Sequence, residues 1–88
     1  MYEINRTDVS IMQILESKSA DNAAFGMTIS EIMEDMQMIG KMSRMTIYRR
    51  LKRLTESGYA AKGVLENHAD TFYLTDKGTR ALKGKFEL

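Results

Sequence analysis

The chain has 88 residues, of which 13 are lysine or arginine and 12 are aspartate or glutamate, and it contains no cysteine. This length suits one compact domain with a modest core, so we expect residues 1–88 to form a single domain. The lack of cysteine excludes disulfides and thiolate zinc sites, and charges interrupt every apolar run before it could form a signal-peptide core or a membrane span. We therefore expect a soluble protein of the cytoplasm with no membrane partner.

The first expected helix covers TDVSIMQILESK, residues 7–18. Thr7 is placed to cap its amino end, and Asp8 lies in its first turn, where a negative charge interacts favourably with the helix dipole. Its apolar side chains form the broad stripe of a helix that packs inside a core: Val9, Ile11, Met12, Ile14 and Leu15. We expect this helix to be buried.

A second, shorter helix is expected in TISEIMEDM, residues 28–36. Thr28 and Glu31 stand at the spacing of a capping box, and apolar residues recur at the helical period. SADNAAFG, residues 19–26, is typical of a connecting loop. QMIGK, residues 37–41, is typical of a turn between two helices.

The third expected helix carries much of the positive charge. It should begin at Ser43, whose hydroxyl can cap a free backbone amide, and end at Gly58. Its core stripe is Ile47, Leu51 and Leu54, and at about 100 degrees per residue the opposite side presents Met45, Thr46, Arg49, Lys52, Arg53 and Glu56. Arg49 and Arg53 repel each other at i, i+4 with no acid between them, which indicates a negatively charged partner.

The period then changes to that of strands. YAAKGVL, residues 59–65, and TFYLT, residues 71–75, predict a hairpin closed by the polar segment ENHAD, residues 66–70. A short extended piece around residues 25–27 is a candidate third strand. A last helix, DKGTRALKGK, is expected to start at Thr75 and Asp76 with Leu82 as its anchor.

This order of elements resembles a winged helix-turn-helix domain, in the style of the MarR, PadR and ArsR groups of bacterial and archaeal transcriptional regulators. The matching segments are TISEIMEDM for the first helix of the motif, SRMTIYRRLKRLTESGY for the recognition helix and its exit, and FYLTDKG for the strand that closes the wing. Together they span residues 28–78.

The resemblance implies an α+β fold, a winged helix with a three-helix helix-turn-helix core, a two- or three-stranded β wing and a short C-terminal helix. It also implies sequence-specific binding of double-stranded DNA by a small transcriptional regulator, with the recognition helix, about residues 43–57, in the major groove. We expect a homodimer on a two-fold related site. Its contacts would use the first helix, the opening MYEIN, or the tail KGKFEL with Phe86 and Leu88. A monomer is the alternative, because the sequence has no long terminal helix with a sustained apolar stripe.

The expected DNA contacts divide by chemistry. Residues in the first turns of a recognition helix reach the base edges, where arginine can bridge guanine acceptors and threonine can donate or accept: Ser43, Arg44, Met45, Thr46 and Arg49. Residues further along meet phosphates and fix the register: Arg50, Lys52 and Arg53. The Tyr48 hydroxyl should face water or a phosphate, and Lys62 should assist from the wing.

The expected wing departs from many DNA-binding wings, which carry lysine or arginine at the tip. Here the tip presents Glu66, His68 and Asp70, and its acids would repel a phosphate backbone. A second interpretation therefore stays open. The chain would then be a winged-helix protein–protein interaction module whose basic helix docks an acidic partner without reading DNA.

We expect no catalysis and no cofactor or metal. Glu31, Glu34 and Asp35 share one short amphipathic helix, with no nucleophile or glycine-rich cradle nearby. His68 is the sole histidine and has no second nitrogen or sulfur ligand. A small-molecule effector leaves no signal in this sequence.

Overall fold

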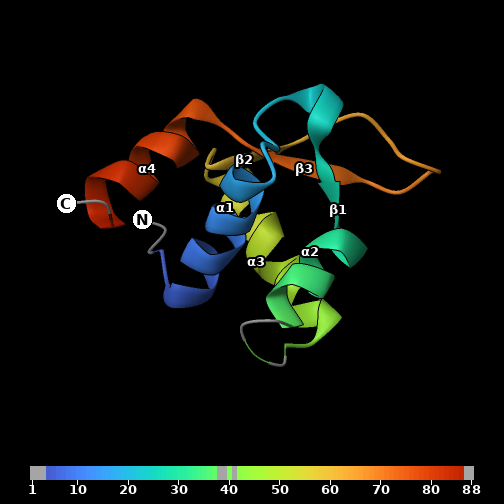
Figure 1. The fold of residues 1–88 in the computed structure, drawn as a ribbon, viewed down its shortest axis with the longest axis horizontal. Coiled ribbons are helices and arrows are strands. Elements are labelled where there is room, and N and C mark those ends of the chain that lie inside the picture. Colours follow the sequence, from blue (N-terminus) through green and yellow to red (C-terminus); the bar gives the residue numbers. More distant parts are fainter. Residues whose placement is uncertain (1–3, 38–39, 41, 87–88) are drawn as a thin grey trace.

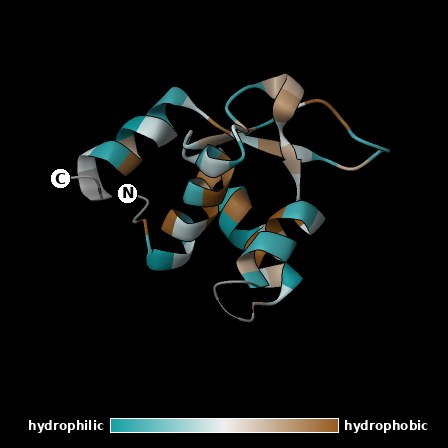
Figure 2. Cartoon of the chain, in the orientation of Figure 1, coloured by the Kyte–Doolittle hydropathy of each residue, from teal (hydrophilic) through white to brown (hydrophobic). Residues whose placement is uncertain are grey.

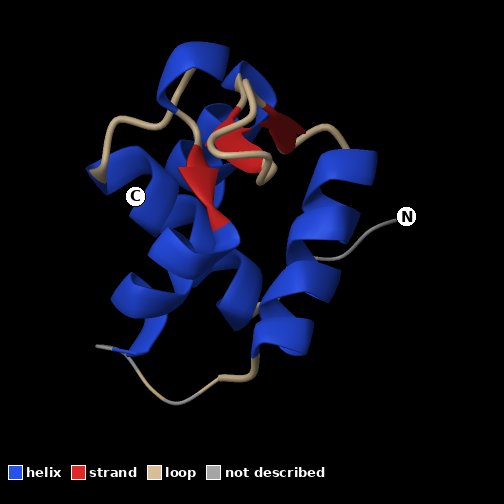
Figure 3. Ribbon diagram, turned by 90° about the vertical axis from the view of Figure 1, so that its right-hand side faces the viewer, coloured by secondary structure: helices blue, strands red, loops and turns tan. Residues whose placement is uncertain are grey.

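The computed structural model describes residues 4–37, 40 and 42–86, with only the backbone of residues 85 and 86. In chain order its elements are α1 (Arg6–Ser17), a 3₁₀ turn (Ala23–Phe25), β1 (Met27–Thr28), α2 (Ile29–Gln37), α3 (Arg44–Glu56), β2 (Ala60–Lys62), β3 (Thr71–Leu74) and α4 (Asp76–Phe86). The strands form one antiparallel sheet in the order β1-β3-β2. Figures 1 and 3 show this small sheet at one edge of the helices, and Figure 1 shows the β2–β3 hairpin reaching outward as a wing. The predicted α+β winged-helix fold is confirmed.

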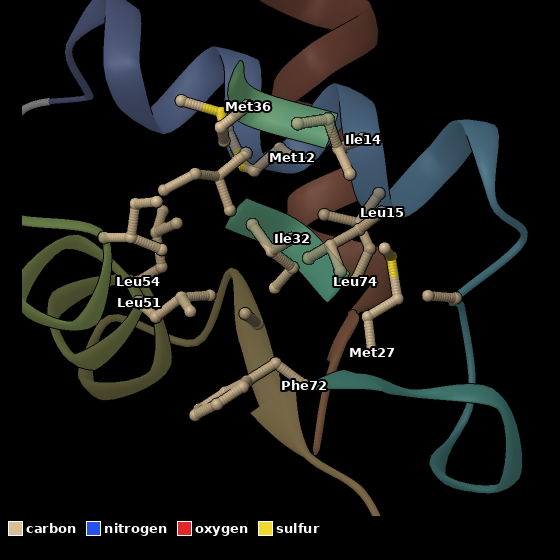
Figure 4. Packing of buried hydrophobic residues seen from close by; sticks show 14 of the residues in the cluster. Met12, Ile14, Leu15, Met27, Ile32, Met36, Leu51, Leu54, Phe72 and Leu74 are labelled. Carbon is tan, nitrogen blue, oxygen red and sulfur yellow. The ribbon is translucent and has the colours of Figure 1, made fainter. Parts of the chain in front are cut away.

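One hydrophobic core joins the four helices to the sheet (Figure 4). Its least exposed large apolar side chains come from every helix and from β3: Ile11, Met12, Leu15, Ile32, Met36, Ile47, Leu51, Leu54, Leu74 and Leu82. Each such side chain stabilises the fold by about 1.5–3 kcal/mol when fully buried. The core stripe expected for α3 is thus confirmed, and Figure 2 shows hydrophobic segments of the helices turned toward one another.

The amino end of α1 differs from the prediction. Its N-cap is Asn5 and not Thr7, because the Asn5 side chain accepts a hydrogen bond from the Asp8 backbone N–H at 2.9 Å. The Asp8 carboxylate accepts one in return from the Asn5 N–H at 3.0 Å. This capping box satisfies two backbone donors reciprocally, which a single hydroxyl at Thr7 cannot do.

Asp8 is buried and also binds α3. Its carboxylate accepts hydrogen bonds from Arg50 Nε at 2.8 Å and from Arg50 Nη2 at 2.6 Å. The Asp8 side chain is 0% exposed and that of Arg50 is 20% exposed. A bidentate pair of this kind restrains both distance and rotation, so it restrains how α3 lies against α1.

The predicted caps of α2 and α3 are confirmed. The Glu31 carboxylate accepts from the Thr28 N–H at 2.8 Å, and Thr28 Oγ1 accepts from the Glu31 N–H at 3.2 Å. Ser43 Oγ accepts from the Thr46 N–H at 3.1 Å and so caps α3. The predicted turn between the two helices falls largely outside the described residues.

α3 ends at Glu56, and the predicted glycine, Gly58, closes its carboxyl end. Gly58 has a φ of 85°, in the left-handed region that favours glycine. The Tyr59 N–H donates to the Leu54 carbonyl at 2.9 Å and the Gly58 N–H to the Thr55 carbonyl at 3.1 Å, which is the Schellman arrangement. The chain therefore turns sharply into β2, and the wing begins beside α3.

The wing is a hairpin, as predicted, but its first strand ends at Lys62 and not at residue 65, and its tip is a tight turn within the predicted loop. Beyond the paired strands, Glu66 and Ala69 exchange backbone hydrogen bonds at 3.0 and 2.8 Å. Asn67 and His68 between them have φ values of 48° and 66°. Two successive residues with positive φ form a type I′ turn, whose twist matches that of the flanking strands.

The third strand and the last helix also correspond to the sequence pattern. The extended piece expected around residues 25–27 lies slightly later, at Met27–Thr28, because Phe25 belongs to the 3₁₀ turn. α4 begins at Asp76 as expected, and its residue Leu82 is buried in the core.

Asp8→Ala is expected to lower the free energy of unfolding by about 3 kcal/mol, because Arg50 would lose its partner and α1 part of its cap. Urea denaturation measures this as a shift of the midpoint. The matched control is Asp35→Ala, which removes the partner of Lys18 at 3.7 Å on the surface. That variant should lose less than about 1 kcal/mol. Equal losses in the two variants would contradict the structural importance of Asp8.

Candidate nucleic-acid interface

The side of α3 opposite its buried stripe faces solvent. The exposed residues of α3, which we call its outer face, are Arg44 at the start of the helix, beside α2, and then Met45, Tyr48, Arg49, Lys52, Arg53 and Glu56. Ser43 is exposed at the N-cap, and Thr46 is half-buried behind it, with its hydroxyl 2.9 Å from that of Ser43. The cationic side of the predicted recognition helix is therefore accessible.

The outer face has an unbalanced positive charge. Glu56 is its sole acid among four cationic side chains. Within the described part of the chain, no acidic side chain pairs with Arg49 or Lys52. The like charges raise the energy of the isolated helix by a few tenths of a kcal/mol, and a polyanion would relieve this repulsion.

Arg44, at the start of α3, also contacts α2. Its Nη1 donates a hydrogen bond to Ser30 Oγ at 3.1 Å and lies 3.9 Å from Met33 Sδ. The side chain remains exposed. A guanidinium has five N–H donors, so Arg44 can keep the Ser30 hydrogen bond through Nη1 and offer its other donors to a partner.

Arg50 is not part of the outer face, and the expected phosphate contact at this residue does not fit the structure. Its guanidinium is held by the buried Asp8 carboxylate, and moving it to a phosphate would leave that carboxylate unpaired. The helical period gave a signal for this. Arg50 follows Ile47 by three residues and precedes Leu54 by four, so it borders the buried stripe.

The wing places acidic groups near the amino end of α3, where Glu66 and Asp70 line one hollow with Arg44. Every residue from 64 to 70 is exposed, including Glu66 and Asp70. The Lys62 ammonium lies 3.4 Å from the Asp70 carboxylate, with both side chains more than half exposed. The Asp70 carboxylate therefore offsets the positive charge of Lys62, and the wing attracts a polyanion less than Lys62 alone would.

A small pocket of about 240 Å³ lies between α3 and the wing. Its lining residues are Tyr48, Lys52, Thr55, Glu56, Lys62 and Phe72. Thr55 Oγ1 is buried there and has no hydrogen-bond partner in the part of the chain that the structure describes. An unpaired buried hydroxyl destabilises a fold by about 1–3 kcal/mol.

The side chains that the structure describes form no evident metal site. Across residues 4–37, 40 and 42–86, no three histidine, aspartate or glutamate side chains are grouped so as to hold an ion. Of the acids considered above, Glu31 caps α2 and Asp35 pairs with Lys18. None of the described helices is both long enough and apolar enough to span a bilayer.

Several solved structures are similar in fold. TubR from Bacillus megaterium pBM400 has a TM-score of 0.74 and 20% identity, with 92% of this chain and 84% of that chain covered. A protein from Ralstonia eutropha JMP134, named as a candidate DNA-binding protein, has a TM-score of 0.72 and 20% identity, with 96% and 99% covered. The ferric uptake regulator of Vibrio cholerae has a TM-score of 0.68 and 12% identity, with 98% and 82% covered.

At these identities the comparisons show a common fold. The sequence matches no protein-family model and no curated protein. The narrower resemblance to the MarR, PadR and ArsR groups therefore stays a prediction.

Thr55→Val is expected to raise the free energy of unfolding by about 1 kcal/mol, because it removes the unpaired hydroxyl and keeps the side-chain shape. The matched control is Thr71→Val. Thr71 is also buried, but its Oγ1 donates to the Val64 carbonyl at 2.7 Å, so this variant should lose about 1 kcal/mol. Urea denaturation of both variants measures the difference. A lower free energy of unfolding for Thr55→Val would show that the Thr55 hydroxyl has a hydrogen-bond partner in solution.

Proposed function

We propose that this chain binds double-stranded DNA through the outer face of α3, which enters the major groove, and that it is a small transcriptional regulator. The observation that carries the proposal is a cationic, exposed face on a helix that is firmly held. Ser43 caps its amino end, Gly58 closes its carboxyl end, and Arg50 ties its inner side to α1. A helix has the width of the major groove.

The proposed contacts follow from position along the helix. Side chains at the amino end approach the base edges and give sequence specificity: Ser43, Arg44, Met45, Thr46 and Arg49. Side chains at the flanks approach phosphates: Tyr48, Lys52, Arg53 and Lys62. Arg50 takes the separate task of holding α3 in place.

The named properties of the structural neighbours support the same role. The Ralstonia eutropha protein is named as a candidate DNA-binding protein, and the Vibrio cholerae regulator has DNA-binding domains. In the proposed role residues 1–88 act as one non-enzymatic domain. A bacterial or archaeal regulator of this kind works in the cytoplasm, where the DNA lies.

The proposed form on DNA is a homodimer on a two-fold related site, because two linked helices bind more tightly than one. α1 and α4 pack together away from the wing (Figure 1), so an interface on that side would leave the outer face of α3 free. Of the other segments considered for dimer contacts, the first three residues of MYEIN and the last two of KGKFEL lie outside the described residues, and the rest of KGKFEL forms the end of α4.

The affinity of the protein for a random duplex, measured at increasing salt concentration, tests DNA binding directly. Neutralising about three phosphates per chain predicts a slope of about −3 in log affinity against log salt, at roughly 0.9 per phosphate. A module that docks an acidic protein would bind no duplex even at low salt. That result would reject the regulator and favour the interaction module.

Two variants should separate base contacts from phosphate contacts. Lys52→Ala is expected to weaken binding to a cognate site and to random DNA equally and to flatten the salt slope by roughly one unit. Arg49→Ala should weaken cognate binding more, by about 1–3 kcal/mol, because a base contact distinguishes sequences. Fluorescence anisotropy on both duplexes measures these effects. Equal losses from Arg49→Ala on the two DNAs would show that it contacts phosphate alone.

A further inference from the structure

Two large apolar side chains lie on the outer face of α3. Met45 is 56% exposed and Tyr48 is 46% exposed, whereas Ile47 between them is fully buried. Residues three apart are neighbours on a helix surface, so Met45 and Tyr48 form one apolar patch. This patch takes no part in the hydrophobic core.

The patch is surrounded by positive charge. Arg49 follows Met45 by four residues and Lys52 follows Tyr48 by four, so each apolar side chain has a cationic neighbour on the same side of the helix. The apolar pair lies in the amino-terminal half of α3, the half that reaches deepest when a recognition helix enters the groove. The cations and the Tyr48 hydroxyl can meet phosphates or guanine acceptors, but the Met45 side chain and the Tyr48 ring need an apolar partner.

Isolated exposed apolar residues are ordinary on protein surfaces. The other large exposed ones in the described part of the chain are Phe25, Val64 and Leu65, which lie on the 3₁₀ turn and the wing. Met45 and Tyr48 differ from them because they lie within the cationic face itself. Their exposed surface contributes to binding only if the partner covers it with apolar atoms.

Base edges in the major groove present one apolar group, the C5-methyl group of thymine. We propose that Met45, with the Tyr48 ring beside it, packs against thymine methyl groups, so that the DNA site carries thymine at the positions these side chains face. The proposal rests on the proposed function and adds the class of sequence that α3 reads. A flexible thioether suits this contact, since it adapts its shape to a small methyl group.

Replacement of thymine by deoxyuridine tests the contact, because it removes the methyl group and keeps base pairing and charge. Sites are first selected from a random duplex pool, and each thymine is then replaced singly. One buried methyl group predicts about a fourfold loss of affinity at the thymines that face the patch and little change at the others. With Met45→Ala/Tyr48→Ala the same replacement should have no effect.

Both substituted side chains are exposed, so the variant should remain folded, and thermal denaturation checks this. Val64→Ala is the matched control, because it truncates a 58% exposed apolar residue of the wing and should leave the deoxyuridine effect intact. Three results would overturn the thymine contact and leave DNA binding in place. The selected sites could lack thymine, all deoxyuridine-substituted duplexes could bind with the same affinity, or the deoxyuridine effect could persist in the double variant. Absence of binding to any duplex would instead overturn the proposed function.

Discussion

The bidentate pair between Asp8 and Arg50 determines how α3 is seated on the rest of the fold. Burial of two charges contributes little net stability, because the loss of hydration offsets most of their attraction. The pair instead supplies geometry. Contacts between leucine and isoleucine side chains tolerate small rotations of a helix, whereas two parallel hydrogen bonds to one carboxylate tolerate very few. Asp8 also completes the cap of α1, so one side chain sets the start of one helix and the orientation of another.

The surface of α3 follows from this arrangement. Arg50 is turned inward, and the neighbouring cations Arg49 and Lys52 are turned outward by the helical period. The Schellman turn at Gly58 then sends the chain back beside the helix, which places the wing and the small pocket along one flank of α3. The accessible face is therefore bounded by α2 at one end and by the hairpin at its side.

Much of the fold was predictable because its signals are local. The caps at Thr28 and Ser43, the glycine at 58 and the change from helical to strand period each depend on a few neighbouring residues. The error at the start of α1 is also local, because Asn5 and Thr7 are both good caps and only the reciprocal bond with Asp8 favours Asn5.

The interactions that the sequence did not reveal are long-range or depend on exact placement. Arg50 meets a partner 42 residues away, and nothing in its neighbourhood identifies Asp8. The pairing of Lys62 with Asp70 depends on the hairpin register. The left-handed conformation of His68 could not be predicted from the sequence, because this turn has histidine where such turns usually have glycine.

The acidic wing beside the basic helix has a consequence for how the molecule approaches a charged partner. With a net charge of +1, the chain as a whole is only weakly attracted to a polyanion at long range. Within a screening length of about 8–10 Å, however, a polyanion interacts with individual surface charges and not with the sum over the chain. Attraction is then strongest at the exposed cations of α3, while Glu66 and Asp70 on the adjacent wing oppose a close approach of the hairpin tip.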